Sequence, residues 1–249
     1  MGKKTVQVDV LAYKEYHIPV HLVSEWRSYT RYALTKKGLI IRVPTVLSQD
    51  AKAQEVLNAK HWMTRQLIAK PQLGAAFVQK SYSDGTELVI GPYTYHLIVK
   101  ETEGQSFSAQ MTKDLKNIHL RIPRIAPLDI RQKYIPQLLS KVIGNARLPE
   151  IISRVAHYNL NYFHQPIANI RLRHNHSNWG SCSTKGNINL STRLLFAPPE
   201  VLDYVIVHEL AHRIEMNHSE RFYDLVRRVM PDFRDKEKWL TTHGPKCHF

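Results

Sequence analysis

The sequence predicts a mixed α+β fold, in which a β-rich N-terminal part is followed by a helical part built around a small sheet. Two observations support this prediction. Short segments with alternating apolar residues and many β-branched side chains dominate the first 123 residues, whereas helical spacing of apolar residues is more frequent in the rest. We therefore expect a basic, β-rich region over residues 1–123 and a second region over residues 124–249.

The N-terminal region is expected to consist mainly of strands. Alternation and β-branching mark strands at 6–13, 38–44 and 93–99. One helix interrupts them over residues 49–70, with Ser48 as its N-cap and Pro71 directly after it. A further β stretch is expected near residues 105–123. No internal repeat is evident along the chain.

The C-terminal region begins with helical sequence near residues 127–161, which we expect Pro136, Gly144 and Pro149 to divide into pieces. Two short strands follow, over 167–174 and 186–190. A long helix then starts at Pro198-Pro199, because proline is favoured in a first helical turn. Asn217, in a left-handed conformation, is expected to end that helix. Ser219 is expected to cap the next helix, which Pro231 stops.

Composition places the chain among ordinary globular proteins. It has 249 residues, of which 43% are hydrophobic and 22% are charged, which is enough to bury a sizeable core. The two cysteines, Cys182 and Cys247, exclude a disulfide-built scaffold and a four-cysteine zinc site. No apolar run approaches the ~20 residues of a membrane-spanning helix, and no signal peptide is recognised. We therefore expect a cytoplasmic protein that does not interact with membranes.

Basic residues outnumber acidic ones, mainly in the N-terminal two thirds of the chain. The formal net charge is +14. Residues 1–165 contain 23 Lys and Arg against 12 Asp and Glu, whereas residues 166–249 contain 12 against 9. A field of this sign attracts polyanions, so nucleic acid or a nucleotide is a candidate partner of the basic N-terminal part. A solvated surface is the alternative, because no dense Lys/Arg cluster is present.

The sharpest motif is His208-Glu209-Leu210-Ala211-His212, which lies in the long C-terminal helix. Residues four apart share a helix face, so His208 and His212 can present their imidazoles to one metal ion. Glu209 then lies beside the open position of the ion, where a general base is needed. A turn after the helix can bring His218 to the same ion. Three histidines and one water are the composition of a catalytic zinc site. The alternative is a buried helix whose histidines hold no metal.

Residues 171–233 resemble the YgjP-like metallopeptidase family, which belongs with the zincins and is related to SprT-like proteases. The resemblance is strongest over this stretch and extends more weakly over roughly 28–245 as one unit. It implies a zincin-like core with one Zn²⁺, bound by His208, His212 and His218, and with Glu209 as the catalytic residue. One departure is Ser191, where the family usually has asparagine. The matching motifs are Trp179-Gly180-Ser181-Cys182, the strand from Gly186 to Leu190, Pro198-Pro199, the His208–His212 motif, Asn217-His218-Ser219 and Met230-Pro231-Asp232.

The resemblance also implies a sheet edge beside the metal, where a peptide substrate binds as an added strand. We assign this edge to residues 186–191 and expect Trp179, Asn189 and Arg193 to contact the substrate. For Trp179 and Cys182 a structural role is the alternative, with both side chains packed around a tight turn.

These observations predict a zinc metallopeptidase that cleaves a protein or peptide substrate, with Glu209 activating water for attack on the peptide bond. Two alternatives stay open. One is a metal-dependent nucleotide pyrophosphatase, because an activated water also attacks phosphorus and the basic part could hold a triphosphate. The other is a nucleic-acid-binding module in which zinc is a structural clip with four protein ligands.

Overall fold

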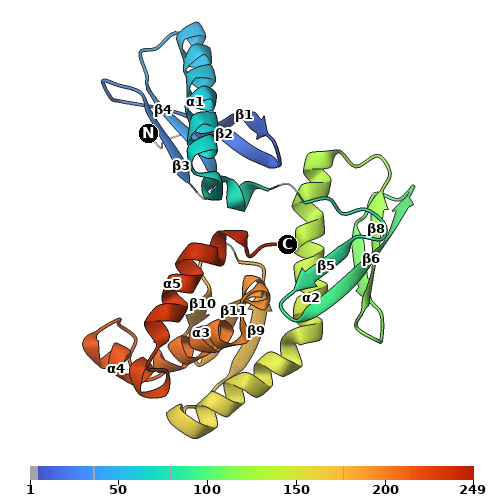
Figure 1. Cartoon of the computed structure of the whole chain (residues 1–249), viewed down its shortest axis with the longest axis vertical. Coiled ribbons are helices and arrows are strands. Elements are labelled where there is room, and N and C mark those ends of the chain that lie inside the picture. Colours follow the sequence, from blue (N-terminus) through green and yellow to red (C-terminus); the bar gives the residue numbers. More distant parts are fainter. Residues whose placement is uncertain (1–4, 36, 79, 176) are drawn as a thin grey trace. The chain divides into compact units, whose positions relative to one another are not determined.

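The computed structural model describes residues 5–35, 37–78, 80–175 and 177–249, and it has the mixed α+β composition expected from the sequence (Figure 1). The chain separates into two compact units, Met1–Gln79 and Lys80–Phe249. A domain division after residue 123 stays a prediction. Among the described helices, none is long and apolar enough to cross a lipid bilayer.

The first unit is a four-stranded sheet that carries a helix on one face. Helix α1 (Gln49–Ala69) begins at Ser48, whose hydroxyl accepts a hydrogen bond from the Ala51 N–H at 3.2 Å. Aliphatic residues of the sheet pack against Ala59, Met63 and Leu67 of α1, and a 3₁₀ helix, η1 (Pro71–Phe77), follows. The strands predicted at 6–13 and 38–44 and the helix predicted at 49–70 are confirmed. The sheet has the order β1-β2-β4-β3, with β1 (Thr5–Tyr13), β2 (Tyr16–Glu25), β3 (Arg31–Thr35) and β4 (Gly38–Pro44).

The second unit begins with a sheet of the same topology. In both sheets the two central strands are parallel, and each edge strand is antiparallel to its neighbour. Helix α2 (Leu128–Tyr158) begins five residues after the end of its sheet, as α1 does. The order is β5-β6-β8-β7, with β5 (Glu87–Ile90), β6 (Tyr93–Thr102), β7 (Ser108–Met111) and β8 (Asn117–Pro123).

The two sheets with their helices are therefore an internal repeat, and the expectation that the chain has none is wrong. β2 and β6 are both 10 residues long and begin with tyrosine. β4 and β8 share one pattern: an aliphatic residue, any residue, an aliphatic residue, arginine, an aliphatic residue and proline (Leu39–Pro44 and Ile118–Pro123). Such short patterns are common in strands, so only the shared strand order identifies the repeat.

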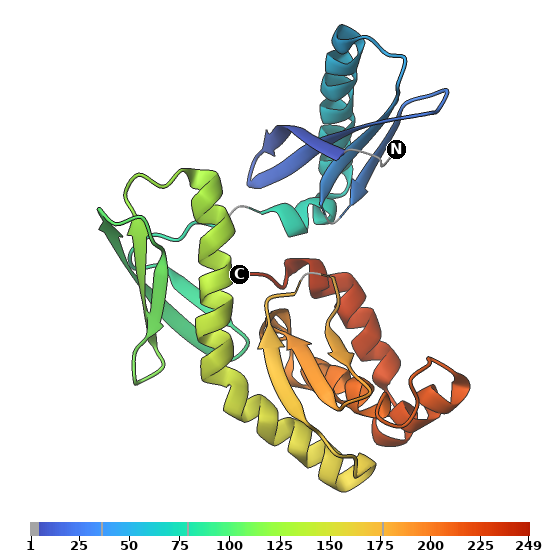
Figure 2. The same cartoon turned by 180° about the vertical axis from the view of Figure 1, so that it is seen from behind.

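The rest of the second unit is a three-stranded sheet packed against helices (Figures 1 and 2). The central strand, β11, is parallel to β9 and antiparallel to β10. Pro199 occupies the first turn of α3, as the sequence predicts. The strands are β9 (Asn169–Arg173), β10 (Gly180–Cys182) and β11 (Asn187–Ser191), the helices are α3 (Pro199–Ala211), α4 (Glu220–Val229) and α5 (Phe233–His243), and the short helical segments are η2 (Asn159–Phe163), η3 (Thr192–Phe196) and η4 (Gly244–Lys246).

Helix α2 is one continuous helix of 31 residues, so the expected division at Pro136, Gly144 and Pro149 is wrong. The helix bends along its length (Figure 2). Each internal proline removes one hydrogen bond and costs about 3 kcal/mol. Burial outweighs this cost, because each large aliphatic side chain contributes ~1.5–3 kcal/mol. The buried aliphatic residues of α2 are Ile135, Leu139, Ile143, Ile151 and Val155.

Helix α3 ends earlier than expected. Its last residue is Ala211, and His212 is the C-cap in a right-handed conformation, with φ −64° and ψ −13°. Among the described non-glycine residues, positive φ occurs only at Lys14, Leu115 and His164, so a left-handed Asn217 does not end the helix. Ser219 does cap α4, since its hydroxyl accepts a hydrogen bond from the Phe222 N–H at 3.4 Å.

Candidate metal centre and active site

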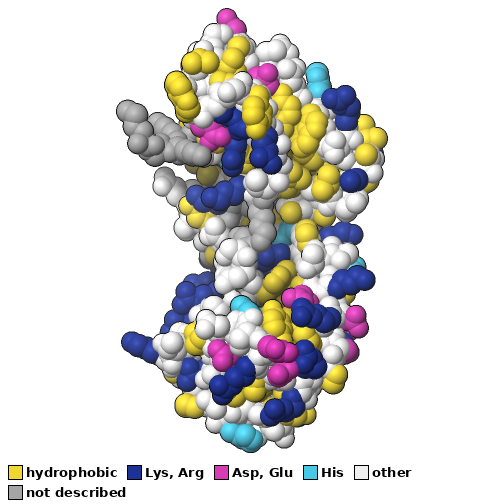
Figure 3. All heavy atoms as spheres, turned by 90° about the vertical axis from the view of Figure 1, so that its left-hand side faces the viewer, with side chains coloured by type: hydrophobic (Ala, Val, Ile, Leu, Met, Phe, Trp, Pro, Cys, Tyr) yellow, Lys and Arg dark blue, Asp and Glu magenta, His cyan; other side chains and the backbone are white. Residues whose placement is uncertain are grey.

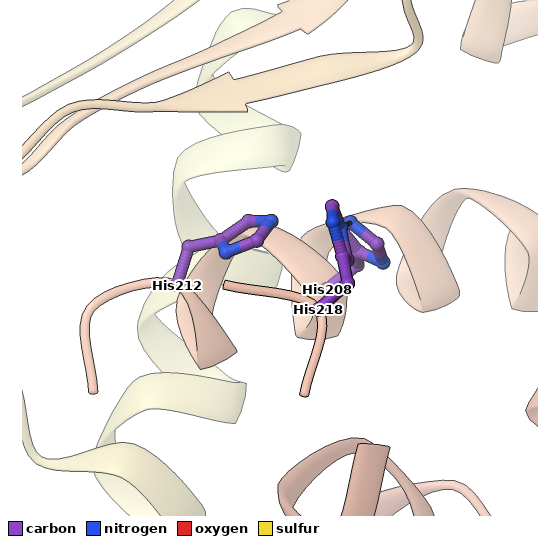
Figure 4. Close-up of side chains that lie close together, drawn as sticks. All are labelled: His208, His212 and His218. Atoms are coloured by element: carbon purple, nitrogen blue, oxygen red, sulfur yellow. Dashed lines mark hydrogen bonds between the residues drawn. The ribbon is translucent and has the colours of Figure 1, made fainter. Parts of the chain in front are cut away.

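Three histidines converge at the C-terminal end of α3. His208 lies in the last turn of the helix, His212 is its C-cap, and His218 lies in the loop before α4. One ring nitrogen of each lies within 4.8 Å of the others, and the Nε2 atoms of His208 and His218 are 3.1 Å apart. Figure 4 shows the ring of His212 turned toward the other two. Two nitrogens bound at about 2.0–2.1 Å to a tetrahedral ion are separated by roughly 3.4 Å, so this spacing suits a single metal ion.

The three rings share one apolar support, the side chain of Phe222. Its ring centroid lies 4.8 Å from those of His208 and His218 and 4.5 Å from that of His212. Phe222 is fully buried in the third position of α4, three residues after the cap. Phe222 is not among the residues that the sequence predicts for the site, although an apolar residue at this position after Ser219 does indicate burial.

Hydrogen bonding and burial prepare the histidines for coordination. Nδ1 of His212 lies 3.1 Å from the carbonyl of Glu215, which can only accept, so Nδ1–H donates and Nε2 keeps a free lone pair. Burial, together with the neighbouring imidazoles of His212 and His218, lowers the pKa of His208 to about 3. Burial also lowers the pKa of His212. Neutral imidazoles are the form that binds a metal ion, so this donor set fits one.

Glu209 extends from α3 toward the three-stranded sheet and is only 4% exposed. Its Oε2 is buried and has no hydrogen-bond partner among the described residues. Burial raises the pKa of Glu209 to about 8. A buried carboxylate oxygen without a partner is rare in folded proteins and needs an explanation, such as a catalytic role. Gly180 of β10 lies directly against this side chain, and a Cβ there would be 2.3 Å from Oε1 of Glu209.

The assignment of the sheet edge to residues 186–191 is wrong, because β11 is the central strand and β10 is the edge next to Glu209. Asn189 lies opposite Ser181 and Arg171 in the sheet, and its side-chain amide donates to the Ser181 hydroxyl at 3.3 Å. The residue pattern predicts that this segment is a strand, but it does not indicate which strands lie beside it, because strand order depends on pairing between distant segments.

Trp179 and Arg193 lie together, with the guanidinium 4.1 Å from the indole ring. Arg193 also donates to the carbonyls of Cys247 (2.8 Å) and Gly244 (2.7 Å). The indole packs against Gly244, where a Cβ would lie 2.5 Å from it. These contacts hold both side chains against the C-terminal segment. A contact of Trp179, Asn189 or Arg193 with substrate stays a prediction.

Cys182, the last residue of β10, is half-buried and unpaired with another cysteine. Burial, followed by the charge of Glu209, raises the pKa of its thiol, which disfavours the thiolate that a metal or a nucleophilic reaction needs. Among the described residues, the group able to hold a metal comprises only the three histidines. These facts favour the structural interpretation of Cys182.

Comparison with known proteins identifies the family. The model of the YgjP-like metallopeptidase domain matches residues 30–243. The chain belongs to this family. A curated relative, the UTP pyrophosphatase of Escherichia coli (strain K12), is 35% identical over 66 residues, or 25% of this chain, and the match spans 40% of the relative's own length. The crystal structure of the metallopeptidase zymogen of Pyrococcus abyssi abylysin is similar over 36% of this chain and 92% of that chain, at 25% identity and a TM-score of 0.34.

Membership of this metallopeptidase family supports a metallohydrolase. The family points to a divalent metal ion, and a histidine cluster suited to one is present in this YgjP-like chain.

Proposed function

We propose that this protein is a zinc-dependent peptidase in which His208, His212 and His218 bind one Zn²⁺ and Glu209 is the general base. The observation that carries the proposal is the convergence of three imidazoles beside a buried carboxylate oxygen that has no hydrogen-bond partner among the described residues. The three-histidine set leaves a coordination position open, as a catalytic site requires. The alternative of a structural clip needs a fourth protein ligand, and the described residues offer only three in the cluster.

In the proposed mechanism, the bound ion supplies Lewis acidity toward water and the scissile carbonyl. Glu209 takes a proton from the attacking water and passes it to the leaving amine. The carboxylate of Glu209 is buried, and its Oε2 has no hydrogen-bond partner among the described residues, which leaves this oxygen available to accept a proton.

The edge strand β10 is the proposed binding site of the peptide backbone. The Trp179 carbonyl accepts a hydrogen bond from the Ser191 N–H of β11 at 2.8 Å. Backbone groups alternate along a strand, so those of Gly180 and Cys182 point to the open edge. The Gly180 carbonyl already accepts from the Asn178 side-chain amide at 2.9 Å, so an extended peptide would pair mainly with the backbone groups of Cys182 and the Gly180 N–H. This edge lies against Glu209, so a peptide bound there passes close to the proposed base.

Substitution of Glu209 by Gln tests the proposal. The amide keeps the size of the side chain but cannot act as a base, so hydrolysis of casein should fall by about 10²–10⁴-fold while zinc content stays unchanged. His218→Ala is the matched control, because it should reduce both zinc content and hydrolysis. Full turnover by Glu209→Gln would exclude Glu209 as the base.

Hydrolysis of a nucleoside triphosphate is the second candidate, and the UTP pyrophosphatase among the relatives is the observation that favours it. Water would attack a phosphorus atom and release pyrophosphate. Two guanidiniums near β10 are already occupied, since Arg213 donates to the carbonyls of Ser183 and Thr184, and Arg193 to those of Gly244 and Cys247. Because these guanidiniums already donate to backbone carbonyls, they are less available to bind phosphate groups, which favours a peptide as the substrate.

One assay separates the two candidates. Zinc-loaded protein is incubated with casein and, separately, with UTP, and peptide release and pyrophosphate release are measured. Pyrophosphate release that is lost in Glu209→Gln, without cleavage of casein, would assign the same site to phosphoanhydride hydrolysis. The cytoplasmic location expected from the sequence stays a prediction.

A further inference from the structure

The internal repeat gives two copies of one module, and the loop between the second and third strands differs sharply between them. In the first copy this loop joins β2 to β3 and reads Trp-Arg-Ser-Tyr-Thr over residues 26–30. In the second copy it joins β6 to β7 and reads Glu-Gly-Gln-Ser-Phe over residues 103–107. Both loops have five residues, so they differ in side chains but not in length: the first contains two aromatic residues and an arginine, and the second contains one aromatic residue and a glutamate.

Two aromatic side chains of the 26–30 loop are exposed. Trp26 is 92% exposed and Tyr29 is 66% exposed, and the guanidinium of Arg27 lies 4.8 Å from the Tyr29 ring. Tryptophan is highly buried on average because burying the indole is favourable, so an indole this exposed beside an exposed tyrosine is a candidate binding surface. The Thr45 N–H donates to the Glu25 carbonyl at 3.2 Å, so the loop starts beside the end of β4.

A pair of arginines lies next to this loop. Arg31, the first residue of β3, is the direct cross-strand partner of Arg42 in β4. Both lie on the face of the sheet opposite α1, because the alternate residues Leu39 and Ile41 pack in the core with that helix. Like charges directly opposite each other destabilise a sheet, so the pair points to an anionic ligand.

The two guanidiniums are available for such a ligand. Within the described parts of the chain, neither Arg31 nor Arg42 forms an ion pair, and the Nε–H of Arg42 is buried without an acceptor. In the second copy Ser108 of β7 lies opposite Arg121 of β8 at the corresponding position, so the pair of arginines is absent there. The first unit as a whole has 12 Lys and Arg against 5 Asp and Glu over residues 1–79.

We propose that Trp26, Tyr29, Arg31 and Arg42 form a binding site for single-stranded nucleic acid. Bases stack on exposed aromatic rings, and the adjacent guanidiniums contact the phosphates. Exposed bases and a flexible backbone favour a single strand over a duplex, because the bases of a duplex are not free to stack on side chains. On the face drawn in Figure 3, Lys and Arg side chains lie among hydrophobic and acidic ones.

The test measures binding of the full chain to fluorescently labelled oligo(dT) and oligo(U) by anisotropy, over a series of salt concentrations. The double variant Trp26→Ala/Tyr29→Ala should weaken binding about tenfold to a hundredfold and leave the salt dependence nearly unchanged. Arg31→Gln/Arg42→Gln should reduce the slope of log affinity against log salt by ~1.4, since each lost phosphate contact contributes ~0.7.

Tyr162→Ala is the matched control, because Tyr162 is 51% exposed and lies in the other unit. It should leave oligonucleotide affinity unchanged. All variants should keep the zinc content and hydrolytic activity of the wild type, so this proposal and the proposed function fail separately. Absence of oligonucleotide binding at low salt, or unchanged affinity of Trp26→Ala/Tyr29→Ala, would overturn the proposal.

Discussion

A single methyl group added at Gly180 should disable catalysis without disturbing the metal site. Gly180 lies in the regular strand β10 and is absent from the glycines with positive φ, so alanine fits its backbone conformation. Glycine is needed at this position because a side chain would collide with Glu209. A Cβ at this position would lie 2.3 Å from Oε1 of Glu209 and 2.8 Å from its Cδ and Cγ.

The expected size of the effect follows from these distances. Comfortable contacts between such atoms are about 3.5 Å, so the carboxylate must withdraw by roughly 1 Å. A displacement of about 1 Å in a catalytic group costs roughly 100-fold in rate, or about 2.7 kcal/mol of barrier. Overpacking lowers the free energy of unfolding by about 1–3 kcal/mol. The three imidazoles are not touched, so zinc affinity should stay within a factor of ten.

Steady-state kinetics of Gly180→Ala, together with zinc content, provide the assay, and a second substitution makes it specific. Glu209→Asp shortens the side chain by one methylene and vacates the space that the methyl group needs. Gly180→Ala/Glu209→Asp should therefore be no less active than Glu209→Asp alone. Ser181→Ala, on the opposite face of β10, is the control. Wild-type kcat in Gly180→Ala, or loss of activity only in proportion to lost zinc, would refute the reasoning.

Three further substitutions test the packing around the site and the first unit. Phe222→Ala removes the shared support of the imidazoles, so the free energy of unfolding should fall by about 3–5 kcal/mol and calorimetric titration should show weaker zinc binding. Arg213→Met removes two hydrogen bonds to carbonyls in the turn at 183–184, and urea unfolding should show a loss of about 1.5–3 kcal/mol. The hydrogen bond from Lys60 lowers the pKa of Asp9, so the pair stabilises the fold above pH 3.8 and loses this effect as the pH falls. Because Asp9 is 40% exposed, Lys60→Met should cost at most about 1 kcal/mol near pH 7 and nothing in strong acid.

Local signals allowed much of the secondary structure to be predicted. Ser48, Ser219 and Pro199 start helices where the sequence placed the starts, because a cap and a first-turn proline act within a few residues. The spacing of His208 and His212 fixes their shared face for the same reason. His218 could be placed at the same site because only a short loop separates it from His212.

Features that depend on distant segments were not predictable in this way. Pro136 and Pro149 signal breaks locally, yet α2 continues because both of its halves are buried. The position of β10 at the sheet edge depends on pairing with β11, and the contact between Gly180 and Glu209 joins residues 29 positions apart. Phe222 is an ordinary apolar residue in the sequence, and only the folded structure places its ring against the imidazoles of the three histidines.

The length of α2 has a consequence for cooperativity. Its first half packs with the β5–β8 sheet through Ile135, Leu139 and Ile143, and its second half packs with the core around α3 through Ile151 and Val155. One continuous helix is thus common to both hydrophobic clusters, so unfolding of either cluster exposes apolar surface of the other. A metal ion bound by the three histidines should stabilise the core around α3. Because α2 joins this core to the β5–β8 sheet, ion binding should also slow hydrogen exchange of amides in β6 and β8, while amides of the first unit exchange at their former rate.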